Sequence, residues 1–151
     1  MAQQFCTFHV GDLFLGIEVE RIQEVLRDIT ITPVPMAPGA VRGLINLRGQ
    51  IVTAIDLRQR FNLPVQPQEV ASSTLVLDAS EEHLSLVVDR AGDVVEVEEG
   101  AFEDPPDTLK GEARRLIRGA YKLKKRLLLV LDLEHAIAFG DTVGEQVRAV
   151  Q

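Results

Sequence analysis

Two aspartates, Asp56 and Asp132, are the residues of this sequence with the clearest potential for chemistry, because each closes an apolar run. A pair of carboxylates at equivalent places could serve as general acid and base. The neighbouring residues argue against that use. Leu57 and Leu133 follow directly, whereas a carboxylate presented in a tight turn favours glycine and small residues. We predict instead that each aspartate ends a strand and caps a short helix, with Gln59 completing a capping-box pattern after Asp56.

Other residue types that carry chemistry occur without the spacing that chemistry needs. The three histidines, His9, His83 and His135, are scattered, and no H-E-x-x-H motif or cysteine pair accompanies them. No serine lies in a G-x-S-x-G turn, and no glycine-rich phosphate loop is present. We therefore predict no catalytic, metal or cofactor residues, and a protein that is not an enzyme. An enzyme using Asp56 and Asp132 remains the alternative, which burial of the two carboxylates would test.

An arginine and a glycine, Arg48 and Gly49, join two β runs, Leu44 to Leu47 and Ile51 to Leu57. Glycine supplies the positive φ of a tight turn, so Arg48 is predicted to lie at a hairpin tip. A turn arginine is either a solvated charge or a rigid fork for a carboxylate of a partner protein. Both interpretations stay open.

The elements that position these residues read as short strands. Alternating apolar residues over Phe5 to Val19, broken at Gly11-Asp12, predict a hairpin, and Ile22 to Leu26 predicts a third strand. Prolines in Ile31 to Pro38 exclude a helix and a central strand, so this segment is a predicted loop. The apolar pattern also predicts core positions at Ile22, Val25, Val88 and Val94.

The second half of the chain repeats the first. With Arg42-Gly43 placed over Arg118-Gly119, an offset of 76 (118 − 42), Arg48 falls on Lys124 and Asp56 on Asp132. Earlier segments match with an offset of 69 (90 − 21), which places Arg21 over Arg90. The difference of 7 (76 − 69) indicates an insertion within 98–115, where Asp104-Pro105-Pro106-Asp107 reads as a surface loop. Gly43 and Gly119 are predicted to begin strands where a neighbouring backbone comes close.

Such a repeat predicts an all-β fold of two like units. About five short strands are too few to bury both faces, so the units should pack on each other as two small barrels around a shared core. Residues 127–131 are apolar throughout, as a strand buried on both faces requires. We expect one domain over 1–151, with interleaved units at roughly 15–70 and 71–151 and the N-terminal strand crossing over. Only short helices are expected, after Asp56 and after Asp132.

Composition narrows the partners. An apolar fraction of 46% can form a core, and the formal charge of −7 disfavours nucleic acid and anionic membrane surfaces. Cys6 is the single cysteine, which fits a reducing compartment. No signal sequence is evident, and no run approaches the roughly 18 apolar residues of a membrane helix. We expect a cytoplasmic protein without direct membrane insertion.

Several blocks together closely resemble the CheW family of bacterial chemotaxis adaptors. The most specific is Asn46-Leu47-Arg48-Gly49-x-Ile51-Val52, preceded by Val41-Arg42-Gly43 and followed by Asp56-Leu57-Arg58. The match extends over nearly the whole chain, from Ile22-Gln23-Glu24-Val25 through Val87-Val88-Asp89-Arg90 and Val94 to Leu129-Val130-Leu131-Asp132. Thr53 stands where a proline is common, and the insertion before Arg118 lies outside the family pattern.

The resemblance implies two SH3-like five-stranded barrels and a scaffold that links chemoreceptor tips to a CheA-type histidine kinase of a two-component system. It implies a receptor-facing groove with Arg48, Gly49, Val88 and Val94, and signalling contacts at Ile22, Glu24, Arg42 and Gly43. Self-association in array rings is left open. The alternative is a CheW-like scaffold, or a module that sequesters the kinase, in a non-flagellar chemosensory pathway.

Overall fold

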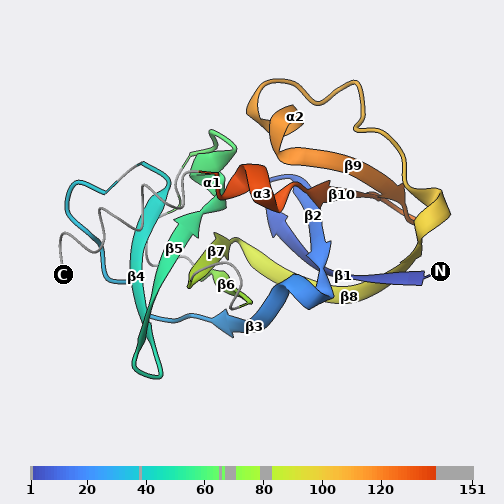
Figure 1. Cartoon of the computed structure of the whole chain (residues 1–151). Coiled ribbons are helices and arrows are strands. Elements are labelled where there is room, and N and C mark those ends of the chain that lie inside the picture. The colour runs from blue at the N-terminus through green and yellow to red at the C-terminus, as the bar shows by residue number, and fades with distance from the viewer. Residues whose placement is uncertain (1, 38, 65, 67–70, 79–82, 139–151) are drawn as a thin grey trace.

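Two five-stranded β-sheets form the molecule (Figure 1). The structure is a computed structural model that describes residues 2–37, 39–64, 66, 71–78 and 83–138. The strands are β1 (Ala2–Val10), β2 (Leu13–Glu18), β3 (Ile22–Arg27), β4 (Val41–Leu47), β5 (Gln50–Asp56), β6 (Ser73–Leu77), β7 (Leu84–Val88), β8 (Arg90–Glu98), β9 (Ile117–Lys122) and β10 (Leu127–Leu131). Three short helices are α1 (Leu57–Arg60), α2 (Glu112–Leu116) and α3 (Leu133–Ala136).

The strand order is the same in the two sheets once the repeat is taken into account. Sheet A runs β8-β1-β2-β10-β9 and sheet B runs β3-β6-β7-β5-β4. Each contains one parallel pair, β2 with β10 in sheet A and β7 with β5 in sheet B. The all-β fold of two pseudo-equivalent five-stranded units is confirmed.

The division of the chain differs from the expected 15–70 and 71–151. Sheet A takes β1 and β2 from the first half and β8, β9 and β10 from the second, while sheet B takes the complementary strands. The crossing therefore involves two antiparallel pairs: β1–β2 joins the later strands β8, β9 and β10, and β6–β7 joins the earlier strands β3, β4 and β5. Neither half of the chain can complete a five-stranded sheet alone. The edges of its strands are paired by strands from the other half.

Irregularities in the ladders repeat with the sequence. Pairing of β4 with β5 skips Arg42, between Val41↔Ile55 and Gly43↔Ala54. Pairing of β9 with β10 skips Arg118 at the equivalent place. The same strands are each joined by one further bridge, Thr32↔Leu44 and Glu103↔Ala120, which continues the sheet around its open side. The bulge and the bridge together bend each sheet towards a barrel.

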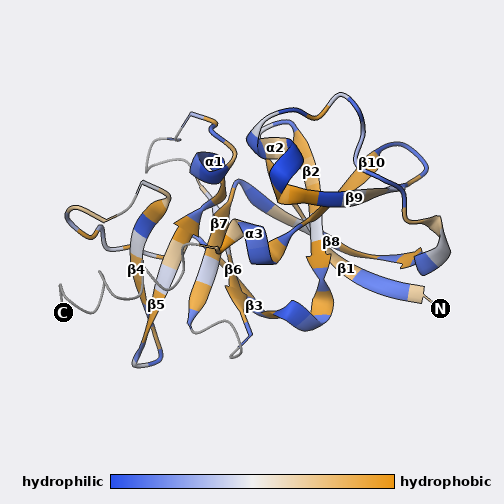
Figure 2. Ribbon diagram, turned by 45° about the horizontal axis from the view of Figure 1, so that its top comes forward, coloured by the Kyte–Doolittle hydropathy of each residue, from blue (hydrophilic) through white to orange (hydrophobic). Residues whose placement is uncertain are grey.

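Among the described residues, four apolar clusters lie in and between the sheets, the smallest around Val41, and Figure 2 shows the apolar residues on the strands. The largest contains Phe8 and Leu15 from sheet A and Leu75 and Leu86 from sheet B, all fully buried. A second lies on the other face of sheet A, and a third on the other face of sheet B. Along β10 the residues alternate between the first two clusters, so the predicted strand buried on both faces and the shared core are confirmed.

Both predicted helix caps are present. The Asp56 carboxylate accepts a hydrogen bond from the Arg58 N–H at 2.9 Å, and the Asp132 carboxylate accepts one from the His135 N–H at 3.1 Å. The expectation of short helices after these two residues is confirmed, and one further short helix, α2, lies inside the predicted insertion. Its five residues are too few to show a helical period in the sequence.

Ion pairs tie the helices to the crossing segments. Arg58 on α1 makes a two-pronged contact with Asp89, at 2.7 and 2.8 Å, and Asp89 also accepts from the Gly11 N–H at 2.7 Å. In the other unit Glu134 of α3, the repeat equivalent of Arg58, lies 3.0 Å from Arg21. Among the described residues, no helix is long and apolar enough to span a membrane.

Candidate functional site

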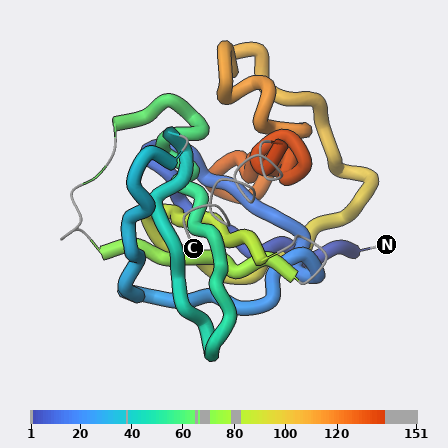
Figure 3. Tube along the Cα trace, turned by 60° about the vertical axis from the view of Figure 1, so that its left-hand side comes forward, coloured from blue at the N-terminus to red at the C-terminus, as the bar shows by residue number. Residues whose placement is uncertain are grey.

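Two of the predicted contact residues, Arg48 and Glu24, meet at the end of sheet B. Arg48 lies at the tip of the β4–β5 hairpin, as predicted, and its guanidinium donates to the Glu24 carboxylate on β3. Figure 3 shows this hairpin extending beyond the rest of the molecule. We call Arg48, Gly49, Glu24 and Ile51 the hairpin surface.

The turn itself fixes the direction of the arginine. Arg48 and Gly49 both have positive φ, 51° and 88°. The Gly49 N–H donates to the Asn46 side-chain oxygen at 3.1 Å, which closes the turn. This backbone conformation suits a two-residue hairpin connection in a right-twisted ribbon. The guanidinium is therefore carried on a defined turn.

Exposure and charge make the hairpin surface available to a partner. The Arg48 side chain is 66% exposed and the Glu24 side chain 28% exposed. The hydrogen bond and the negative charge of Glu24 raise the pKa of Arg48, so the guanidinium stays ionised. Ile51, on the same hairpin, is 42% exposed. The surface thus combines a cation, a carboxylate and an apolar side chain.

Arg42 and Gly43 lie at the opposite end of β4, where both make contacts within the fold. The Arg42 guanidinium lies 3.5 Å from the buried Asp56 carboxylate. Gly43 is buried against the Thr32 backbone, where a Cβ would come within 2.2 Å of the Thr32 oxygen. The predicted close approach at Gly43 is confirmed, as is the one at Gly119, where a Cβ would lie 2.5 Å from the Glu103 oxygen.

The remaining predicted contacts divide between surface and core. Val88 is 2% exposed and belongs to the shared core, so its side chain is not accessible in this fold and its assignment to the groove is corrected. Val94 on β8 is 54% exposed, and Val25 on β3 is also exposed, so the core prediction for both is wrong. They occupy equivalent edge strands, whose outer face no strand covers. Ile22 is partly buried against the shared core.

The two aspartates do not form a catalytic pair. Each carboxylate accepts from the first turn of its own helix, and the Asp132 carboxylate also lies 2.7 Å from His135 Nδ1. Asp56 is 2% exposed, and one of its oxygens has no hydrogen-bond partner among the described residues. Burial raises the pKa of Asp56, against the opposing hydrogen bond from Arg58 and the charge of Arg42.

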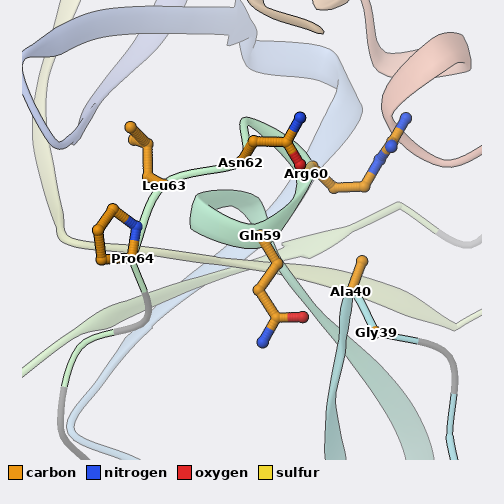
Figure 4. Close-up of a pocket in the computed structure, with 7 residues that line it drawn as sticks. All are labelled: Gly39, Ala40, Gln59, Arg60, Asn62, Leu63 and Pro64. Carbon is orange, nitrogen blue, oxygen red and sulfur yellow. The ribbon is translucent and has the colours of Figure 1, made fainter.

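A shallow hollow of about 700 Å³ lies beside α1, lined by Gly39, Ala40, Gln59, Arg60, Asn62, Leu63 and Pro64 (Figure 4). Its one ionisable side chain, Arg60, turns towards α3 and donates to the carbonyls of Ala136 and His135 at 2.9 and 2.8 Å. The other polar groups are the amides of Gln59 and Asn62. These offer no nucleophile or general base, so the hollow supports no reaction.

Comparison with known proteins gives one consistent family. Residues 4–139 match the CheW-like domain. The chain is 29% identical to the chemotaxis protein CheW of Treponema pallidum, over 86% of this chain and 79% of that protein, and 28% identical to CheW of Bacillus subtilis, over 86% and 83%. The crystal structure of the scaffolding protein TtCheW from Thermoanaerobacter tengcongensis superposes with a TM-score of 0.80 at 25% identity, covering 91% of this chain and 93% of that one.

Proposed function

The chain belongs to the CheW-like domain family, a family of non-catalytic chemotaxis adaptors, and from this premise we propose that it links chemoreceptor cytoplasmic tips to a CheA-type histidine kinase. The proposal places its work in the cytoplasm. The observation that carries it is the hairpin surface, where Arg48 on the projecting β4–β5 turn contacts Glu24 on β3. Contacts of this size are individually modest, and an array makes them strong through multivalency.

We assign the receptor contact to the hairpin surface. The guanidinium of Arg48 keeps free N–H groups beyond those that Glu24 accepts, because arginine carries five donors. A receptor carboxylate can therefore join Arg48 without breaking the pair inside the chain. Ile51 adds exposed apolar area to the hairpin surface. The surface thus combines an apolar side chain with an arginine, a combination typical of the centre of protein–protein interfaces.

The test is titration calorimetry of Arg48→Ala against a soluble receptor fragment that carries the signalling tip. Loss of this charge contact should weaken receptor binding measurably. Glu24→Gln should weaken binding in the same direction, because the guanidinium loses its orientation. The matched control is Arg27→Ala, which removes an exposed cation from β3, the edge strand that carries Glu24. This variant should bind the receptor fragment normally.

Unchanged receptor affinity in Arg48→Ala would reject the hairpin surface as the contact. Co-sedimentation then separates the adaptor from the kinase-sequestering alternative. An adaptor brings the kinase to receptor-bearing membranes, and a sequestering protein keeps the kinase in solution.

A further inference from the structure

We propose that the end of sheet A opposite α3 is a second docking surface, which binds an acidic peptide segment of a partner protein. The surface consists of exposed cations around the β9–β10 turn, namely Arg90, Lys122, Lys124, Lys125 and Arg126. We call it the basic end. The proposal is independent of the receptor contact at the hairpin surface.

Strand register gathers these residues at one end of the sheet. Lys122 pairs with Leu127 across the β9–β10 turn, and His9 pairs with Arg90 across β1 and β8. The parallel pairing of β10 with β2 brings Arg126 to the start of β2. Two segments that are distant in the chain, the start of β8 and the β9–β10 turn, therefore contribute cations to one surface.

One cation of the basic end is held in place by an aromatic stack. The Arg126 guanidinium lies 3.6 Å from the centre of the Phe14 ring, and the His9 ring lies 5.1 Å from that centre at a tilt. Stacking orients the guanidinium and leaves its edge N–H groups for a ligand. The nearby charges of Arg90 and Arg126, after burial, lower the pKa of His9, as expected where cations converge.

The carboxylates near the basic end leave a cationic excess. Asp89 is occupied by Arg58 and the Gly11 N–H, and Glu103 lies 3.7 Å from Lys122. Asp12 and Asp93 are exposed beside the cations. Lys124 is the repeat equivalent of Arg48 and Asp93 that of Glu24, yet these two form no salt bridge among the described residues, unlike their counterparts. Apart from Lys122, the cations of this turn, Lys124, Lys125 and Arg126, therefore form no salt bridge within the described part of the molecule.

The net charge of the whole chain indicates which kind of ligand the basic end binds. A local cationic surface on a chain of net charge −7 is not needed for solubility. An extended polyanion such as nucleic acid or an anionic bilayer would also meet the acidic remainder of the surface. A short segment of glutamates and aspartates would meet only the basic end, and guanidinium forks bind carboxylates well. In Figure 1 the β9–β10 turn lies at the right, away from the β4–β5 tip, so both surfaces can be occupied together.

The test is fluorescence anisotropy of the intact protein with a labelled peptide of consecutive glutamates, at low and high sodium chloride. Lys124→Glu combined with Lys125→Glu should weaken binding by about tenfold. Arg126→Lys keeps the charge and removes the planar stack, and should weaken it by about threefold. The control combines Arg27→Glu with Lys110→Glu, which changes the net charge equally at exposed positions elsewhere and should bind nearly as the parent does.

Three results overturn the proposal. Equal weakening in the control would show a general charge effect. Binding to phosphatidylglycerol vesicles that needs Lys124 and Lys125, without peptide binding, would assign the basic end to a membrane. Self-association by sedimentation that the Lys124→Glu, Lys125→Glu variant loses, again without peptide binding, would assign it to a second copy of this chain.

Discussion

The two helix-capping aspartates have the same role in the repeat and different surroundings. Asp132 has His135 beside it and is partly exposed, while Asp56 is buried with only Arg42 near its second oxygen. A buried carboxylate with an unsatisfied oxygen favours its neutral form, because burial removes the water that stabilises the charge. Burying the charged carboxylate of Asp56 therefore costs stability, and the more exposed carboxylate of Asp132 does not carry the same desolvation cost.

We predict that Asp56→Asn is more stable than the parent at neutral pH. Asparagine keeps the cap and removes the buried charge, whereas Asp56→Ala loses the cap and should lie below Asp56→Asn by about 1 kcal/mol. The pKa of Asp56 is raised above its ordinary 3.8, so the folded chain holds the proton more tightly than the unfolded chain. That stability is present at low pH and is lost as pH rises through the folded pKa. Urea denaturation over a pH series measures it.

The gap between Asp56→Asn and the parent should thus shrink on acidification. A gap that stays constant with pH, or widens in acid, would contradict the raised pKa. Asp132→Asn is the matched control, since it keeps a cap but removes a more exposed carboxylate with a histidine partner, and no gain in stability is expected.

At the scale of single residues, the sequence located Arg48 at its turn but not the carboxylate that receives it. Turn chemistry is local, and Gly49 alone indicates where the chain reverses. The contact with Glu24 joins residues 24 positions apart and depends on how β3 packs, which local pattern does not specify. Val88 and Val94 show the same limit, because equally apolar residues lie on a covered and an uncovered strand face.

Among the elements, the bulged strands β4 and β9 use glycine to let a second chain segment approach. Gly43 has a φ of 154°, and the Thr32 backbone lies against it with hydrogen bonds to Leu44 of 2.8 and 2.9 Å. Gly119 makes the equivalent approach to Glu103. The two bridges that curve the sheets depend on these contacts, which is the structural reason for glycine at both positions.

We predict that Gly43→Ala lowers the free energy of unfolding by about 2 kcal/mol or more, because its Cβ would overlap the Thr32 backbone and φ is unfavourable. Gly100→Ala is the control, since no atom lies within 4 Å of its Cβ position. It should be neutral or slightly stabilising. Urea denaturation compares the two. Equal stability of the two variants would show that the bridge tolerates displacement and that Gly43 is not structurally required.

The hairpins, the proline-rich loop and the helix caps were predictable because each follows from neighbouring residues. The exchange of the β1–β2 and β6–β7 pairs between the sheets was not. A period of two tells which face of a strand is buried but not which sheet the strand joins. The offsets of 76 and 69 did predict that both units contain equivalent strands, and the strand orders of the two sheets agree with that.

At the scale of the whole molecule, interleaving makes the two barrels one folding unit. Sheet A needs strands from both halves of the chain, and so does sheet B. The largest apolar cluster contains side chains from both sheets, so these side chains are fully buried only when both sheets are formed. We therefore expect the two barrels to unfold together, so that a partner bound to one barrel is held on the same rigid unit as the other barrel. Such rigidity suits a scaffold that must hold two partners in a fixed relation.

This coupling predicts that damage in sheet B is felt in sheet A. Ile45 is buried on the outer face of sheet B, and Ile45→Ala should cost about 3 kcal/mol. The chain has one tyrosine and no tryptophan, and Tyr121 is buried in the separate cluster of sheet A, so its fluorescence reports that sheet alone. In urea, the Tyr121 transition and the circular dichroism transition should coincide in the parent and shift together in Ile45→Ala. Two separated transitions, with the Tyr121 midpoint unchanged, would mean that the barrels unfold independently and that the shared core does not couple them.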